Sequence, residues 1–237
     1  FHDVDIDRYI IDGKLTQMFL SVRELDKEAL DDNAKTWVNQ HLKYTHGYGL
    51  TMSPVNKVTS SGQPSMVVRN VPPVSDYKEL EVTVPQIYFG ELTNDYVVVN
   101  TDEQEFDYPM GEELQTTKYQ GTAGIKLNFL NKVLYSIREG SFKLLVSGGV
   151  NSDSKIIINR NIMDRVNKIA PFLSYDEDPY AVVVNGKIYY IIDGYTTTKY
   201  FPYAEPFNEN ANYIRNSFKV IIDAYNGDVN YYIVEEK

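Results

Sequence analysis

The strongest local signal for the fold is the stretch YAVVVNGKIYYII at residues 180–192. Two runs rich in Val, Ile and Tyr, residues 180–184 and 187–192, flank the dipeptide Asn185-Gly186. β-Branched and aromatic residues favour strands. Asn-Gly suits a two-residue type I′ turn, because both central residues of that turn need a positive φ. The stretch therefore predicts a β-hairpin.

A second hairpin is predicted further along the chain. Residues 219–224 and 229–234 are again apolar runs, and Asn226-Gly227 lies between them. Residues 15–25 alternate in polarity and predict another strand. Residues 86–90 and 96–100 predict two strands around a turn at residues 91–95.

Three segments have helical periodicity. They are residues 32–44, which Asp32 or Asn33 would cap, residues 126–138, and residues 159–169. The apolar face of the second contains Phe129, Leu130, Val133, Leu134 and Ile137, and in the third we expect Ile162, Val166 and Ile169 to point inward. Residues 142–146 predict a short strand.

Hairpins and helices thus occur in separate local groups. This favours an α+β fold, with an antiparallel sheet, hairpins and about three helices, over a wound parallel sheet. Glycine and proline punctuate residues 45–75, which predicts a loop-rich region with short strands. Gly148-Gly149 suggests an internal boundary near residues 148–152, dividing the chain into 1–150 and 151–237.

Composition excludes several classes of protein. The formal net charge is −10 and the pI about 4.8, which argues against nucleic-acid binding because phosphates attract clustered Lys and Arg. There are no cysteines, so disulfides and thiolate sites are excluded. The longest apolar runs have the length of strands, whereas a membrane helix needs about 20 apolar residues. The chain begins without Met, and we interpret it as a piece of a larger protein.

Catalytic signals are weak. The chain has no Gly-x-Ser-x-Gly elbow, no Walker loop and no dinucleotide-binding glycine motif. His41 shares the apolar face of the first helix, so we expect a hydrogen-bonded core residue. His46 precedes Gly47, which predicts an exposed turn, and it is the better base or ligand. A hydrolase would pair it with carboxylates in the following segments; the candidates are Glu91, Asp95 and Asp107.

Acidic residues also raise the possibility of a metal site. Asp176 and Asp178 precede the first hairpin and, together with backbone carbonyls, could hold Ca²⁺. Solvated surface is the alternative for the same residues. No other cofactor is indicated. Arg160, Arg165 and Arg215 stand among asparagines, a combination that could clamp an anion or satisfy buried backbone groups.

Several longer strings resemble a known family. The strings are TWVNQHLKYTHGYG at residues 36–49, IYFGELTNDY at 87–96, EFDYP at 105–109, NRNI at 159–162, IAPFL at 169–173, NYIRNS at 212–217 and DAYNG at 223–227. Together they resemble an uncharacterised family of large bacterial multi-pass membrane proteins from clostridia, actinobacteria and cyanobacteria. The resemblance covers nearly the whole chain. Outside the apolar faces these strings are rich in Asn, Tyr, Asp and His, as are both polar sites and buried polar networks.

The resemblance implies a parent protein with several N-terminal membrane helices, followed by a large soluble region that includes this chain. It implies that this part faces outside the cytoplasm, and it brings no activity or catalytic residue. Three hypotheses follow. The first is a non-enzymatic extracytoplasmic module that binds a ligand, an ion or the remainder of its own parent chain. The second is a hydrolase that uses His46, and the third is a calcium-stabilised structural domain.

Overall fold

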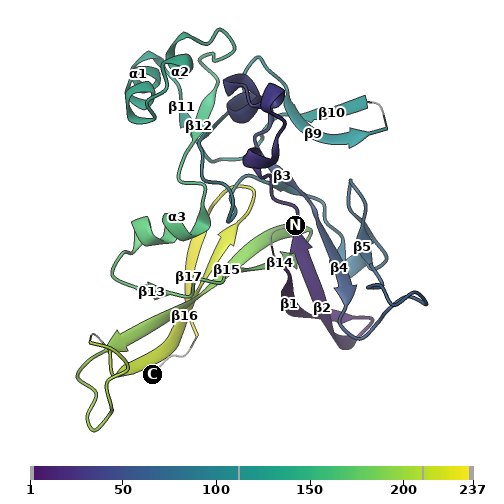
Figure 1. Cartoon of the computed structure of the whole chain (residues 1–237), viewed down its shortest axis with the longest axis vertical. Coiled ribbons are helices and arrows are strands. Elements are labelled where there is room, and N and C mark those ends of the chain that lie inside the picture. Colours follow the sequence, from purple (N-terminus) through teal and green to yellow (C-terminus); the bar gives the residue numbers. More distant parts are fainter. Residues whose placement is uncertain (1–2, 112, 210, 235–237) are drawn as a thin grey trace.

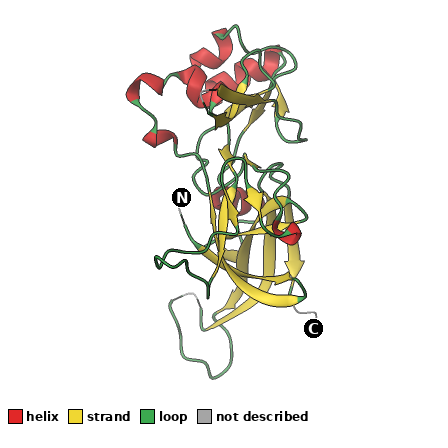
Figure 2. Ribbon diagram, turned by 90° about the vertical axis from the view of Figure 1, so that its right-hand side faces the viewer, coloured by secondary structure: helices red, strands yellow, loops and turns green. Residues whose placement is uncertain are grey.

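The protein has an α+β fold, as the sequence predicts. The computed structural model describes residues 3–111, 113–209 and 211–234. Long strands fill one end of the molecule, and the longer helices lie mainly toward the other (Figures 1 and 2). All pairs between named strands are antiparallel. Within the described residues, no helix is long and apolar enough to cross a membrane.

The hairpin at residues 180–192 is confirmed. Strand β14 (Tyr180–Val184) pairs with β15 (Lys187–Thr198), and the turn residues Asn185 and Gly186 both have positive φ, +50° and +79°. Strand β15 also pairs with β13 (Ser174–Tyr175) and with β16 (Tyr213–Asp223), which pairs with β17 (Val229–Ile233). Strand β15 of the first hairpin is therefore the central strand of a five-stranded sheet, since it pairs with β13, β14 and β16.

The second Asn-Gly turn differs from the prediction. Gly227 has φ +68°, but Asn226 does not have a positive φ, so this is no type I′ turn. The loop is longer because the carboxylate of Asp223 accepts hydrogen bonds from the N–H groups of Tyr225 and Asn226, at 2.8 and 3.0 Å. The prediction of the hairpin is confirmed, and the prediction of its turn is wrong.

A third hairpin, outside the predicted set, lies near the start of the chain. Strand β1 (Asp5–Ile11) pairs with β2 (Lys14–Val22) through Asp12 and Gly13, whose φ values are +50° and +73°. Asp-Gly is the same type I′ signal as Asn-Gly. The sheet continues through three further strands, β4 (Leu50–Pro54), β5 (Val68–Arg69) and β6 (Val74–Ser75). These short strands agree with the loop-rich region predicted over residues 45–75.

A small sheet separates two hydrophobic cores. It consists of β8 (Val97–Val99), β12 (Lys155–Ile157) and β11 (Ile125–Lys126). Val97, Val99 and Ile157 pack into the larger core, while Val98 and Ile156 pack into the smaller one, because alternate side chains of a strand point to opposite faces. The pairing of β8 with β12 joins residues on both sides of positions 148–152. The boundary there stays a prediction.

The predicted pair of strands at residues 86–90 and 96–100 is wrong in its partners. Strand β7 (Gln86–Ile87) pairs with β3 (Gly47–Tyr48), and β8 pairs with β12. The acidic segment after β8 is part of a hairpin of β9 (Glu105–Met110) and β10 (Glu113–Thr117). The partners of β7 and β8 are determined by contacts between segments that are distant in sequence, and no local sequence pattern encodes such pairing.

Two predicted helices are present, each with an asparagine cap. They are α1 (Phe129–Arg138), capped by Asn128, and α3 (Ile162–Ile169), capped by Asn161. In α3, Ile162 and Val166 are buried, but Ile169 is exposed, contrary to the prediction. The strand predicted at residues 142–146 is wrong: this segment is helix α2 (Phe142–Val146), since a short apolar run is compatible with either structure.

The helix predicted over residues 32–44 is only partly formed. A 3₁₀ turn, η2 (Asp32–Ala34), comes first, and a separate helical segment ends in a π turn, η3 (Asn39–Lys43). Thr36, rather than Asp32 or Asn33, caps the second part, because its Oγ1 accepts a hydrogen bond from Asn39 N at 3.2 Å. Two further 3₁₀ turns are η1 (Lys27–Ala29) and η4 (Lys78–Leu80).

The two type I′ turns provide a matched test of packing. A Cβ added at Gly186 would lie 2.4 Å from Thr83 Oγ1, whereas a Cβ at Gly13 meets nothing within 4 Å. Both glycines have a positive φ, so alanine is strained at either site. We expect Gly186→Ala to destabilise the chain by about 1–3 kcal/mol more than Gly13→Ala does. Urea unfolding of both variants measures this difference; equal losses would contradict it.

Candidate functional site

His46 lies in the protein interior, so the prediction of an exposed turn is wrong. Its side chain is 0% exposed. It directly precedes β3, which pairs with β7. Nδ1 lies 3.0 Å from the carbonyl oxygen of Gly47, to which it donates in the neutral tautomer. Nε2 then presents a lone pair, and it has no hydrogen-bond partner among the described residues.

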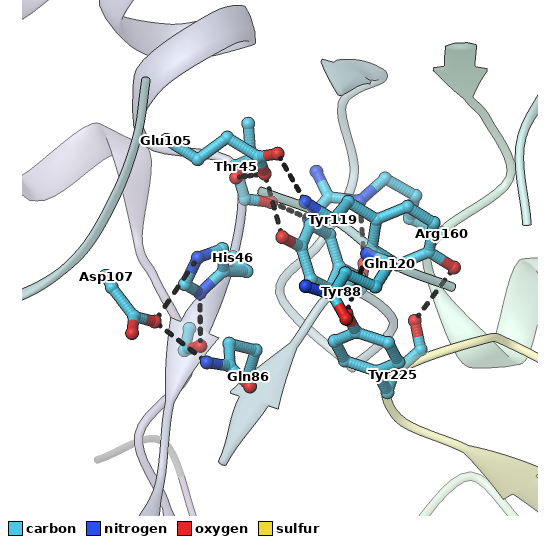
Figure 3. A network of polar contacts seen from close by, with 11 residues as sticks. Thr45, His46, Gln86, Tyr88, Glu105, Asp107, Tyr119, Gln120, Arg160 and Tyr225 are labelled. Carbon is cyan, nitrogen blue, oxygen red and sulfur yellow. Dashed lines mark hydrogen bonds and ion pairs between the residues drawn. The ribbon is translucent and has the colours of Figure 1, made fainter. Parts of the chain in front are cut away.

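Asp107 is the carboxylate nearest to His46 (Figure 3). Its Oδ1 lies 3.8 Å from His46 Nε2, and the same oxygen accepts a hydrogen bond from Gln86 Nε2 at 2.9 Å. Burial raises the pKa of the Asp107 carboxyl group. The fold therefore brings together two of the residues that the hydrolase hypothesis paired.

The imidazole of His46 is held neutral. Burial lowers its pKa to about 4, and the positive charge of Arg160 acts in the same direction. A neutral imidazole is a base in principle, but a general base has to reach the proton that it removes. The His46 side chain is fully buried, so no substrate can reach its ring in this structure. The hydrolase hypothesis stays a prediction without geometric support.

Glu105 is the second buried acid of this region. Its Oε2 accepts hydrogen bonds from Thr45 Oγ1 at 2.6 Å and Tyr88 OH at 2.7 Å, and its Oε1 accepts one from Tyr119 N at 3.0 Å. Tyr119 and Tyr225 extend the network, since Tyr225 OH accepts from Gln120 N at 3.0 Å (Figure 3). Burial raises the pKa of Glu105, and these donors lower it again in part. The network is a well-satisfied buried cluster.

Arg160 connects this network to the rest of the fold. Its guanidinium donates to three backbone carbonyls: Nε to Tyr88 O at 2.7 Å, Nη2 to Thr45 O at 2.6 Å, and Nη1 to Asp95 O at 3.2 Å. The side chain is buried, and burial lowers its pKa to about 10. Of the two roles that the sequence suggests for Arg160, an anion clamp and a donor to buried backbone groups, these contacts show the second.

Glu91 and Asp95 lie away from His46, on the loop that joins β7 to β8. Glu24 holds this loop, because its carboxylate accepts hydrogen bonds from Glu91 N at 2.8 Å, Leu92 N at 2.7 Å and the hydroxyl of Tyr190. Burial, and then the charge of Glu24, raise the pKa of Glu91 to about 8. Asp95 is 57% exposed and lies 3.8 Å from Lys27 Nζ. Glu24 stands in Arg23-Glu24-Leu25, a further string that resembles the family, but no sequence pattern indicates a site role for Glu24 or Lys27.

His41 behaves as the sequence predicts. Its Nδ1 lies 2.8 Å from the carbonyl oxygen of Tyr96, and its ring stacks on the Tyr96 ring with centroids 4.1 Å apart. Burial lowers the pKa of its imidazole. His41 is therefore a hydrogen-bonded residue at the edge of the smaller core.

Asp176 and Asp178, the proposed calcium ligands, lie before β14. Asp176 already accepts hydrogen bonds from Tyr195 OH at 2.6 Å and Asp178 N at 3.1 Å. The Tyr195 hydroxyl lowers the pKa of Asp176. In the described ranges, no three or more His, Asp or Glu side chains are grouped to hold a metal ion. Calcium binding here stays a prediction.

Comparison with known proteins gives the family. The model of the uncharacterised protein family UPF0182 matches residues 1–237. The chain belongs to this family. Curated UPF0182 relatives include proteins from Alkaliphilus metalliredigens, 58% identical over 238 residues, and from Clostridium botulinum strain Okra, 55% identical over 237 residues. No solved structure matches the chain.

The UPF0182 chain is matched over its full length by these relatives, but it spans only about a quarter of theirs. It covers 25% of the Alkaliphilus protein and 26% of both the Clostridium botulinum protein and a 53% identical protein from Clostridium acetobutylicum. This agrees with the interpretation of the chain as part of a larger protein.

Arg160 provides the first test of the UPF0182 site. Lysine keeps the charge but cannot reach three carbonyls, so Arg160→Lys leaves buried acceptors without donors. We expect it to reduce the free energy of unfolding by roughly 2–5 kcal/mol. The matched control is Arg138→Lys, at an exposed pair with Glu139, where we expect a loss below about 1 kcal/mol. Chemical unfolding measures both; a small loss at Arg160 would contradict the structural role.

His46 gives the UPF0182 chain a defined pH dependence. Its pKa falls from 6.5 in the unfolded chain to about 4 in the fold. The unfolded state therefore binds more protons between these values, and stability is lost as the pH falls from 6.5 toward 4. We expect His46 to contribute a loss of roughly 3 kcal/mol over this range.

The measurement compares the wild type with His46→Gln from pH 7 to pH 4. Other groups titrate in both proteins, so the difference between the two unfolding curves isolates His46. The wild type should lose more stability than the variant. Parallel curves would contradict the lowered pKa, because they would mean that His46 titrates alike in the folded and unfolded states.

Proposed function

We propose that this chain is a non-enzymatic docking module of a larger membrane-attached protein, held against the remainder of its parent chain. The observation that carries the proposal is an apolar helix face turned away from the protein. Six side chains form this α1–α2 face, and each is between 53% and 82% exposed. They are Phe129, Leu130, Leu134, Ile137, Phe142 and Val146.

The orientation of α1 is the reverse of that in an ordinary surface helix. Amphipathic helices normally bury the apolar side. Here Ser136 is buried, and Lys132 Nζ donates to the carbonyls of Ser147 and Val150 at 3.4 and 3.2 Å. Helix α2 packs beside α1 at one end of the molecule (Figure 1). These inward polar contacts fix α1 with its apolar side outward.

A cover for this face is energetically favourable. Complete burial of a Leu, Ile or Phe side chain contributes about 1.5–3 kcal/mol. The burial free energy of six such side chains is large enough to hold one module against another, even if burial is incomplete. Four of the six, Phe129, Leu130, Leu134 and Ile137, share one face of α1 by their helical spacing, and large exposed apolar patches mark interaction sites.

The remainder of the parent chain is the occupant we propose. About three quarters of the length of the relatives lies outside this chain. Those segments are tethered to the module, so their effective concentration is high and docking needs little intrinsic affinity. In this proposal the parent carries the membrane helices that the family resemblance implies, and the module lies on the extracytoplasmic side.

The two other hypotheses have less support. A hydrolase needs access to His46, which is enclosed, and a calcium domain would have to recruit an Asp176 carboxylate that already accepts two hydrogen bonds. Both stay predictions.

Photo-crosslinking in the full-length protein tests the docking proposal. A photoreactive residue replaces Leu134 in one variant and Val58, which is also exposed but lies on the distant loop between β4 and β5, in the control. We expect Leu134 to crosslink to segments outside residues 1–237, identified by mass spectrometry, and Val58 to do so much less. Adducts from Leu134 only to lipid, or equal yields at both sites, would overturn the proposal.

A further inference from the structure

Lys27 occupies an unusual position for a lysine. It begins the η1 turn, and its side chain is only 11% exposed. Its Nζ has no hydrogen-bond partner within the described part of the chain. The carboxylate paired with it, that of Asp95, is 3.8 Å away, beyond hydrogen-bonding distance. A buried ammonium group without a hydrogen bond is costly, which makes a missing acceptor the natural explanation.

A cavity of about 180 Å³ lies beside Lys27. A water molecule occupies about 30 Å³ in the liquid, so this space has room for an ion of several atoms. The lining includes Lys27 and Arg160, together with Leu92, Thr93 and Asn94 from the loop that Glu24 holds. One wall of the cavity is therefore a loop that the Glu24 carboxylate holds by hydrogen bonds.

Two buried cations meet at this cavity. Among the described residues, the Arg160 guanidinium donates to three carbonyl oxygens and to no carboxylate, so no direct contact neutralises its positive charge. Burial, and then the charge of Arg160, lower the pKa of Lys27 to about 7. Asp95 offsets this in part, but it is largely exposed and its charge is screened by solvent.

The lining also offers a neutral donor. Asn94 Oδ1 accepts a hydrogen bond from Asn161 Nδ2 at 2.9 Å, which leaves the N–H groups of the Asn94 amide as donors. Two further acids line the cavity, Asp26 and Glu28, and both are exposed residues. Asp26 is engaged locally, because its Oδ1 accepts from Glu28 N at 2.9 Å. Solvent hydrates both of these carboxylates.

We propose that this cavity binds a small oxyanion, a carboxylate or a phosphate group, with Lys27 as its principal donor. The anion supplies the acceptor that Nζ lacks and neutralises the paired positive charges of Lys27 and Arg160. Asn94 contributes a second hydrogen bond. Asp95 acts against binding, because it competes for the ammonium group and repels the anion.

Equilibrium dialysis of the full-length protein tests this site, with radiolabelled inorganic phosphate and acetate as probes at constant ionic strength. We expect Lys27→Gln to lose one bound anion per chain relative to the wild type. Lys187→Gln is the matched control, since Lys187 also lies within 4 Å of a carboxylate, that of Asp223, and should bind as the wild type does. Binding of phosphate alone would identify a phosphate site, and binding of acetate alone a carboxylate site.

Asp95→Asn makes the test independent of any folding defect in the Lys27 variant. Loss of the competing carboxylate should lower the dissociation constant of the anion several-fold. Equal binding by the wild type and Lys27→Gln would overturn the proposal. So would weaker binding by Asp95→Asn, because Asp95 would then support the site.

Discussion

The guanidinium of Arg160 donates to the carbonyls of Thr45, Tyr88 and Asp95, which belong to two segments, one at residue 45 and one at residues 88–95, that are both far from Arg160 in sequence. Buried carbonyls need donors, and here one planar group serves three of them. Thr45 and Tyr88 also bind Glu105 through their hydroxyls, and Asp95 faces Lys27. The His46 region and the Lys27 cavity are therefore positioned by the same buried side chain.

Around Arg160 the protein buries acids as well as bases. Glu105 binds Thr45, Tyr88 and Tyr119, while Glu24 holds the loop that begins at Glu91. The strings that resemble the family are rich in polar residues, which indicates either polar sites or buried polar networks. Thr45, Tyr88 and Glu105 form a buried network. His46 differs from them because its Nε2 faces the Asp107 carboxylate without a hydrogen bond. The polar interior thus serves mainly to join distant segments in one arrangement.

The two cores explain how the outward helices stay in place. Strand β8 buries both of its faces, so Val97 and Val99 belong to one core and Val98 to the other. Leu144 of α2 packs into the smaller core, which anchors the helical end of the chain while Phe142 and Val146 remain exposed. A rigid support behind an apolar face suits docking on another part of a longer protein, and the length of the UPF0182 relatives leaves ample chain to provide it.

Local chemistry in the sequence was enough for the hairpin at Asn185-Gly186, for α1 and α3, and for the α+β class. Turn conformation and helical periodicity depend on neighbouring residues, so they can be predicted from the sequence without knowledge of the fold. Asp12-Gly13 carries the same turn signal. Tertiary contacts alone set the burial of His46, the loop held by Glu24 and the outward face of α1. Each depends on residues distant in the chain, as Glu24 and Glu91 illustrate, and side-chain burial is a property of the whole packing arrangement that no local pattern encodes.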